Sequence, residues 1–280
     1  MFGVQHAFHG DLVGGLYRAA DRLGYELALS AVTPDRDEQR AVSSLLQDRC
    51  EALVLLGPHA PTAYLGALAD RLPVVVVARA VRHRAVDVVR TADDEGLHQA
   101  VAHLVGLGHR RIVHIDGGRA PGAPDRRRGY RDAMRQHGLD PEIRILPGGL
   151  TEDDGAAAAR ALLGEASEPT AVIAFNDRCA TGVLDVVARA GRTVPGHVSV
   201  VGYDDSRLAR LSHVALTTVA QDTGQISTLA VTRAIERLES TPVAPRELVI
   251  APHLVVRGTT ACPGTGAEVL ATPGARASTC

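Results

Sequence analysis

Lysine and tryptophan are both absent from this chain of 280 residues, and every one of its 30 basic side chains is an arginine. A Walker A phosphate loop needs its lysine, and so do Schiff-base and pyridoxal-phosphate chemistry. The absence of lysine therefore excludes those classes of enzyme. Because aromatic residues make up only 3% of the chain, a core must be built from alanine, valine and leucine.

Other features are also scarce. The four cysteines (Cys50, Cys179, Cys262 and Cys280) include no C-x-x-C pair, so neither zinc ligands nor a redox pair are expected. No apolar run approaches the roughly 20 residues that span a bilayer, and the first residues lack a secretion leader. A net charge of −2 offers no electrostatic reason to bind nucleic acid. We therefore expect a cytoplasmic protein without a metal, a cofactor or a membrane contact.

Short apolar runs alternate with amphipathic stretches along the chain. Leu12, Leu16, Ala20 and Leu23 recur at helical spacing, and Gly24 ends that helix. By the same reasoning, helices are expected at 12–23, 33–50, 93–107, 126–137, 151–163, 179–190 and 226–238. Strands are expected at 25–32, 53–56, 74–78, 111–115, 171–175, 198–203, 248–250 and 254–256.

This alternation predicts an α/β fold with doubly wound parallel sheets. The number of strands is too large for one comfortable open sheet, so two lobes are expected. The first lobe would comprise residues 1–117 and 221–250, and the second 118–220 and 251–262. The glycine-rich segment 117–124 would form the first crossing between lobes, and 263–280, rich in small and polar residues, would be a disordered tail.

Enzymatic signatures are missing. The chain has no G-x-S-x-G elbow, no H-E-x-x-H and no G-x-G-x-x-G, and Gly117, Gly118 and Gly122 are spaced unlike a dinucleotide loop. The sequence therefore predicts a binding protein without catalytic residues.

Several segments together resemble the effector-binding core of the lac repressor/galactose repressor family, whose fold is that of periplasmic sugar-binding proteins of type I. In chain order they are His103-Leu-Val-Gly-Leu-Gly-His-Arg-Arg-Ile112, Arg126-Arg-Arg-Gly-Tyr130, Thr170-Ala-Val-Ile-Ala-Phe-Asn-Asp177, Val198-Ser-Val-Val-Gly-Tyr-Asp-Asp205, Leu216-Thr-Thr-Val-Ala-Gln221 and Leu254-Val-Val-Arg-Gly258. Each is weak alone, but their order and spacing cover residues 1 to about 261.

The resemblance implies a ligand cleft between the two lobes, lined in the second lobe by Arg126, Asn176 and Asp204, with Gln221 at the second crossing. Arginine, asparagine and aspartate replace the water around a polyhydroxylated ligand well, since they offer donor forks and paired acceptors. Each position has a plainer interpretation: a solvated arginine cluster, a helix cap or a hinge residue. Replacing Arg126 or Asp204 is expected to abolish ligand binding and to change the melting temperature of the free chain little.

The first lobe offers a less regular match. Gln5-His-Ala-Phe-His9 stands where the family carries an Asn-Pro-Phe-like turn, with Ala7 replacing the proline. His6 would donate a hydrogen bond, Phe8 would stack on the apolar face of a sugar, and Arg79 is a further candidate that a surface ion pair explains equally well. Asp93-Asp94-Glu95 is interpreted as compensation of a helix dipole.

The implied function is that of a sugar-responsive transcription regulator. A small-molecule effector would shift a homodimer between two states and so control operator DNA through a helix-turn-helix headpiece, which is expected to be missing before Met1. The alternative is a solute-binding protein of a sugar transporter, which shares the fold; the absent leader and the free cysteines favour the regulator. The sequence leaves the identity of the effector open.

Overall fold

The computed structural model describes residues 7–165, 168–240 and 246–264, and the chain divides into two compact units. The first unit comprises Met1–Ala92, Ala120–Gly122 and Gln221–Pro252. The second comprises Asp93–Arg119, Ala123–Ala220 and His253–Cys280. His6 and most of the predicted tail (residues 265–280) lie outside the described residues. Each unit has its own sheet and its own apolar core, as the α/β prediction requires.

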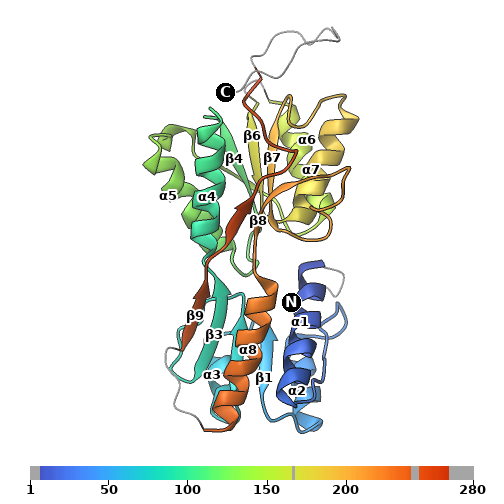
Figure 1. Cartoon of the computed structure of the whole chain (residues 1–280), viewed down its shortest axis with the longest axis vertical. Coiled ribbons are helices and arrows are strands. Elements are labelled where there is room, and N and C mark those ends of the chain that lie inside the picture. The colour runs from blue at the N-terminus through green and yellow to red at the C-terminus, as the bar shows by residue number, and fades with distance from the viewer. Residues whose placement is uncertain (1–6, 166–167, 241–245, 265–280) are drawn as a thin grey trace. The chain divides into compact units, whose positions relative to one another are not determined.

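The first unit is built on a parallel sheet in the order β1-β2-β3-β9. Its strands are β1 (Leu53–Leu56), β2 (Val74–Val77), β3 (Val86–Thr91) and β9 (Glu247–Ile250). Its helices are α1 (Ala7–Leu23), α2 (Glu38–Gln47), α3 (Thr62–Ala69) and α8 (Thr223–Leu238) (Figure 1).

The valines of β2 show how this sheet is covered on both faces. Val75 and Val77 pack with α1 and α8, whereas Val74 and Val76 pack with α2 and α3. Successive side chains of a strand point to opposite faces, so a continuous apolar run is what a strand between two helical layers requires.

The second unit holds a six-stranded sheet in the order β10-β8-β7-β6-β4-β5, of which β10 alone is antiparallel to its neighbour. The strands are β4 (Ile112–Asp116), β5 (Arg144–Pro147), β6 (Ala171–Ala174), β7 (Ser199–Asp204), β8 (Thr217–Ala220) and β10 (His253–Val255). The helices are α4 (Asp93–Gly106), α5 (Ala123–Gln136), α6 (Glu152–Leu163) and α7 (Asp177–Arg189), with a short 3₁₀ turn at Asp140–Glu142. Helices α4 and α5 pack on one face of the sheet, and α6 and α7 on the other.

The prediction of two doubly wound parallel-sheet units is confirmed, but the first boundary differs. Residues 93–117 were expected in the first lobe, and the structure begins the second unit at Asp93 instead of near residue 117. The reason is packing, because Leu97, Val101 and Leu104 of α4 share one buried core with Tyr203 and other residues of the second unit.

The strand predicted at 25–32 is wrong. This segment forms no strand; Tyr25 and Leu27 pack against the core of the first unit, whereas Leu29 is 57% exposed. A strand needs a neighbour for its backbone hydrogen bonds, and among the described residues the sheet ends at β1. An alternating apolar pattern alone does not supply that neighbour.

The cysteines differ in state. Cys50 and Cys179 are free thiols, but Cys262 is disulfide-bonded, which the sequence did not predict. Within the described ranges, no helix combines the length and apolar character that crossing a bilayer requires.

Candidate functional site

Three loops gather at one edge of the sheet in the second unit. Strands β4, β6 and β7 are neighbours and run parallel, so the segments that follow them leave the sheet at the same edge. Asp116 ends β4, Asn176 follows β6 and Asp204 ends β7. Ligands of open α/β sheets bind at this carboxyl edge.

Arg126, in the first turn of α5, holds the centre of this edge and is only 5% exposed. Its Nε donates to Oδ1 of Asp93 at 2.9 Å, and its Nη1 donates to the carbonyl oxygen of Phe175 at 2.5 Å. Its Nη2 lies 3.9 Å from Oδ1 of Asp204. The guanidinium thus joins α4, the end of β6 and the end of β7 within one buried cluster, the Arg126 cluster (Arg126, Asp93, Asp204, Phe175 and Tyr203).

Aromatic rings fix the plane of the guanidinium. Its central carbon lies 3.5 Å from the ring centroid of Tyr203 and 4.5 Å from that of Phe175. A cation desolvated against aromatic faces gains about 2 kcal/mol in favourable cases. The hydroxyl of Tyr203 lies over Gly96, where an added Cβ would meet it at 2.7 Å. Glycine at this point of α4 therefore permits the close approach that positions Tyr203.

Burial and charge act against each other inside the Arg126 cluster. Burial opposes the positive charge of Arg126, but Asp93, Tyr203 and Asp204 outweigh that effect and raise its pKa above the ordinary value. Burial raises the pKa of Asp93, which the Arg126 charge only partly counters. Arg126 therefore stays positively charged. Removing the neighbouring carboxylates from water costs free energy, and hydrogen bonds from a bound ligand would offset part of that cost.

Within the described part of the chain, two of the five N–H groups of this guanidinium donate hydrogen bonds, one to Asp93 and one to Phe175. The 3.9 Å between Nη2 and Asp204 is an ion pair beyond hydrogen-bond distance. A hydroxyl group bound there would accept from Arg126 and donate to Asp204, so this pair has the chemistry to hold a polyhydroxylated ligand.

Asn176 caps helix α7 and also braces a loop. Its Oδ1 accepts from the backbone N–H of Cys179 at 2.8 Å, and its Nδ2 donates to the carbonyl of Leu150 at 3.1 Å. The interpretation as a helix cap is therefore confirmed. A contact with ligand stays a prediction, and the neighbouring carbonyl of Phe175 already links this turn to Arg126.

The backbone is unusual where β7 ends. Asp204 has φ of 110° and Asp205 of 51°, both in the left-handed region that non-glycine residues rarely adopt. Asp205 is held there by Arg210 at 2.9 Å and by Arg257 at 2.6 Å. Such strain is found where the surrounding structure requires it, often at binding sites.

Asp177 ties the loop after β7 to the sheet. Its carboxylate accepts from the hydroxyl of Thr218 at 2.6 Å and from the N–H of Ser206 at 2.7 Å. Burial is the main cause that raises the pKa of Asp177 to about 6. The residue positions the turn that carries Asp204.

The candidate ligand residues of the first unit pack against, or form hydrogen bonds with, other residues of the same unit. Phe8, in the first turn of α1, is 6% exposed and belongs to the apolar core formed with β2 and α8. Arg79 donates to the carbonyls of Pro58 and Ala60, at 2.8 and 2.7 Å. Gln221 accepts from the hydroxyl of Thr91 at 2.6 Å, which joins two chain segments at the edge of the unit. Ligand roles for Phe8, Arg79 and Gln221 stay predictions.

The sequence missed Asp93. It was interpreted with Asp94 and Glu95 as compensation of a helix dipole, but its side chain is buried against Arg126. Asp94 instead pairs with Arg128 at 3.0 Å. Because the pairing spans 33 residues, spacing in the sequence offers no signal for it.

In the described residues, no group of three or more histidine, cysteine or acidic side chains could hold a metal ion.

Residues 101–260 match the family model of the periplasmic binding protein-like domain. The chain is 32% identical to the ribose operon repressor of Escherichia coli K12, over 90% of this chain and 78% of that one. Its fold matches a LacI transcriptional regulator from a Rhodococcus species with a TM-score of 0.91 and 51% identity, covering 94% of this chain and 97% of that one.

A second solved structure, the transcriptional regulator CelR in complex with cellobiose, matches with a TM-score of 0.80 and 29% identity. The match covers 91% of this chain and 80% of that one. These relatives are regulators of transcription rather than transport proteins or enzymes. The fold, the edge of polar groups and these similarities agree with one another. The chain belongs to the lac repressor/galactose repressor (LacI/GalR) family of transcriptional regulators.

Proposed function

We propose that this chain is the effector-sensing core of its regulator and that the effector is a small sugar or sugar derivative. Arg126, Asn176 and Asp204 of the second unit would bind the hydroxyl groups, and His6, Phe8, Arg79 and Gln221 are the candidates from the first unit. The observation that carries the proposal is the buried Arg126 guanidinium, whose Nη2 lies 3.9 Å from Oδ1 of Asp204, far enough apart for a hydroxyl group to bind to both.

The physical argument is one of desolvation. A sugar exchanges many hydrogen bonds with water for hydrogen bonds with protein, and each group left unpaired costs about 1–3 kcal/mol. A guanidinium held flat between aromatic rings presents its donors in a fixed direction, so little entropy is lost when a ligand binds. The cellobiose bound to the relative CelR supports a carbohydrate as the class of ligand.

We further propose that the effector biases a homodimer between two states and thereby sets its affinity for operator DNA through a helix-turn-helix headpiece. An effector shifts such an equilibrium only by the difference in its affinity for the two states. The names of the relatives, which are an operon repressor and transcriptional regulators, support DNA as the partner and the cytoplasm as the location. No step of this function requires catalysis.

A thermal-shift screen tests the proposal. The purified chain is melted with ribose, galactose, cellobiose, other mono- and disaccharides, and inorganic phosphate. A sugar present at 100 times its dissociation constant adds about 2.7 kcal/mol to the free energy of unfolding. We expect one class of sugar to raise the melting temperature, and Asp204→Asn to reduce that rise. Chemical conversion of the sugar would contradict the proposal. So would a melting temperature that none of the tested sugars raises.

A further inference from the structure

A loop of the second unit begins at the candidate effector site. This segment, the 205–216 loop, lies between Asp204, the last residue of β7, and Thr217, the first residue of β8. Compact surface loops of this kind have ends that lie close together. Because Asp204 directly precedes the loop, a contact that closes the base of the loop also bears on the position of Asp204.

Arg257 closes that base. It lies two residues after β10, and its guanidinium donates to both ends of the loop. Nη2 donates to Oδ1 of Asp205 at 2.6 Å, and Nη1 donates to the carbonyl oxygen of Leu216 at 2.8 Å. Both donors belong to one rigid and planar group, so the guanidinium fixes the distance between the first and the last residue of the loop.

The backbone around Arg257 is itself held in place. The N–H of Arg257 donates to the hydroxyl of Thr217 at 2.9 Å, and the N–H of Gly258 donates to the carbonyl oxygen of Ala215 at 2.7 Å. The hydroxyl of Thr259 accepts from the N–H of Thr217 at 2.9 Å. These hydrogen bonds restrict the backbone that carries the guanidinium, so Arg257 is a fixed point for the loop to bind.

The turn at the end of β7 needs such a fixed point. Asp204 has φ of 110° and Asp205 has φ of 51°, so two successive residues with side chains occupy the left-handed region. Residues stay in that region only where the surrounding structure holds them. The next residue, Ser206, is held by the hydrogen bond from its N–H to the carboxylate of Asp177 at 2.7 Å. The carboxylate of Asp205 is held by arginines.

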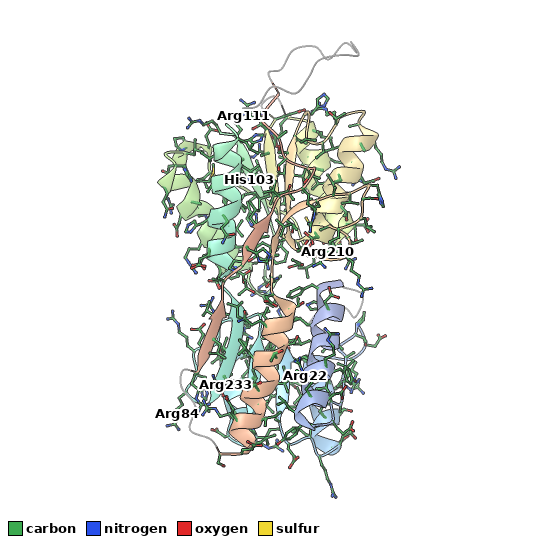
Figure 2. All side chains as sticks on the ribbon, viewed as in Figure 1. Arg22, Arg84, His103, Arg111, Arg210 and Arg233 are labelled. Atoms are coloured by element: carbon green, nitrogen blue, oxygen red, sulfur yellow. The ribbon has the colours of Figure 1, made fainter. Side chains whose placement is uncertain are left out.

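Two arginines bind Asp205, and they differ in burial. Arg257 keeps 21% of its side chain exposed, and Asp205 keeps 12%. Arg210, which lies within the loop, binds the same carboxylate at 2.9 Å but keeps 62% of its side chain exposed (Figure 2). Water and salt screen an exposed ion pair, so it contributes less than a pair that is largely buried. Arg257 in addition reaches the far end of the loop at Leu216.

We propose that Arg257 is a positioning residue for effector binding. By joining Asp205 to Leu216, it holds the turn that carries Asp204. In that turn Oδ1 of Asp204 lies 3.9 Å from Nη2 of Arg126. The inference rests on the proposed function, in which a hydroxyl group of the sugar binds between these two side chains. Arg257 does not touch the sugar; its loss would let the turn relax toward ordinary backbone angles and displace the Asp204 carboxylate.

Amide hydrogen exchange of the free chain tests this positioning without a ligand. Arg257→Gln removes the charge and the planar fork from the base of the loop. We expect exchange at residues 204–216 to become about tenfold faster, with no change in β6 at residues 171–174. Unchanged exchange in the loop would overturn the proposal. Faster exchange in β6 as well would mean a general structural role and would also overturn it.

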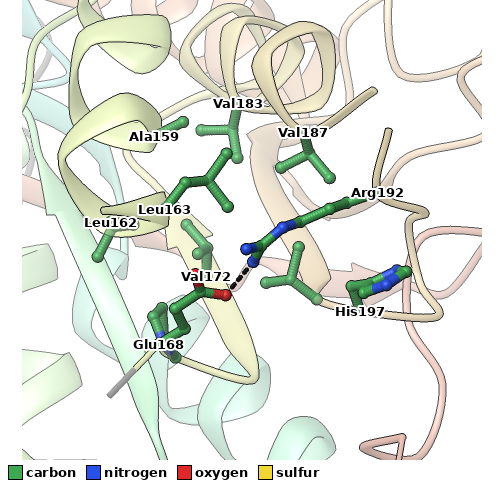
Figure 3. Close-up of a pocket in the computed structure, with 11 residues that line it drawn as sticks. Ala159, Leu162, Leu163, Glu168, Val172, Val183, Val187, Arg192 and His197 are labelled. Carbon is green, nitrogen blue, oxygen red and sulfur yellow. Dashed lines mark hydrogen bonds and ion pairs between the residues drawn. The ribbon is translucent and has the colours of Figure 1, made fainter. Parts of the chain in front are cut away.

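Two further arginines supply the controls. Arg210→Gln removes the exposed partner of Asp205 and should accelerate exchange in the loop by about twofold at most. Arg192→Gln breaks a half-buried ion pair with Glu168 beside a small hollow between α6 and α7 (Figure 3). Glu168 precedes β6, so this pair lies at the opposite edge of the sheet, and its loss should leave the loop unchanged. An effect of Arg210→Gln as large as that of Arg257→Gln would overturn the role of loop closure.

Calorimetric titration with ribose, galactose and cellobiose links the turn to binding. For a sugar that binds, Arg257→Gln and Asp205→Asn should each lower the affinity about tenfold, and the double variant should bind no more weakly than either single variant, because both act through one contact. Arg257→Lys, which keeps the charge, should restore part of the affinity. Additive losses would overturn the proposal. Failure of the unchanged chain to bind any of the three sugars would count against the proposed function and leave this inference to the exchange experiment.

Discussion

The two units treat their candidate ligand residues differently. In the second unit, Arg126 and Asp204 are ionic side chains buried within one cluster, and their charges face one another across 3.9 Å. In the first unit, Phe8 is part of the apolar core, and Arg79 and Gln221 serve the unit's own loops and segments. The second unit therefore carries a buried cluster of paired charges, whereas the candidates of the first unit pack in its core or bind its own backbone and side chains.

This difference has an energetic consequence. Buried charges are costly unless paired, so the second unit depends on the residues of the Arg126 cluster for stability as well as for the recognition that we propose. The first unit depends on its candidates through packing and single hydrogen bonds. Substitutions in the second unit should couple ligand binding to stability, and substitutions in the first should affect the two separately.

Arg126→Ala should have the largest effect. It leaves the carboxylates of Asp93 and Asp204 buried without their cation, so we expect a loss of about 3–5 kcal/mol in the free energy of unfolding together with loss of sugar binding. This revises the expectation from sequence that the free chain would be little affected. Chemical denaturation measures the loss.

A matched control comes from the same unit. Arg189 forms its ion pair with Asp185 on the surface, where Arg189 keeps 78% of its side chain exposed. Arg189→Ala should leave both stability and binding unchanged. If Arg126→Ala were equally silent, the Arg126 cluster would not be the stabilising feature described above.

The next largest effect is expected at low pH, which should lower the stability of the second unit. Burial lowers the pKa of His114 to about 4, while an unfolded histidine titrates near 6.5. The stabilisation by neutral His114 is thus complete above pH 6.5 and is lost as the pH falls toward 4, by up to about 3 kcal/mol. Hydrogen exchange between pH 7 and 5 should show falling protection in β4 and α5, and His114→Gln should flatten that dependence.

Asp177 changes stability in the opposite direction. Its pKa is raised to about 6, so its contribution is complete below the unfolded value near 3.9 and is lost as the pH rises through 6. Asp177→Asn should therefore steepen the loss of stability in acid. A shallower acid dependence in that variant would show that folding does not raise the pKa of Asp177.

Asp204→Asn should have a smaller and more selective effect. Asparagine keeps the size of the side chain and tolerates the left-handed backbone, but it removes a charged acceptor. A hydrogen bond to a charged group contributes about 1.5–3 kcal/mol, so we expect sugar affinity to fall about 10- to 150-fold in calorimetric titrations. Unchanged affinity would remove Asp204 from the site.

The smallest effect is expected in the first unit. Thr91→Val removes the hydrogen bond to Gln221 from a residue that is 2% exposed, which should cost about 1 kcal/mol of unfolding free energy. Sugar affinity should change less than in Asp204→Asn. Thr228→Val, on half-buried helix surface of the same unit, is the control; a larger loss there than at Thr91 would break the comparison between the units.

Local pattern predicted much of the fold. The apolar run of β2 and the helical spacing of residues 12–23 were correct because burial on both faces, or along one stripe, leaves a direct trace in the sequence. Strands β3, β5 and β8 were missed, since charged or threonine residues interrupt their apolar pattern. The opposite error occurs at 25–32, where a pattern typical of a strand predicted one that the structure does not contain.

The sequence by itself determined the alternation of helices and strands, the family, and the polar residues at the carboxyl ends of β6 and β7. Only the tertiary structure decided that Asp93 is the partner of Arg126, that Phe8 belongs to a core, and that the second unit begins at Asp93. The physical reason is range: helical and strand periodicity act over a few residues, whereas buried ion pairs join residues far apart in the chain. The desolvation of such a pair, which is unfavourable, and its strengthened attraction arise only when folding has excluded water around the two charges.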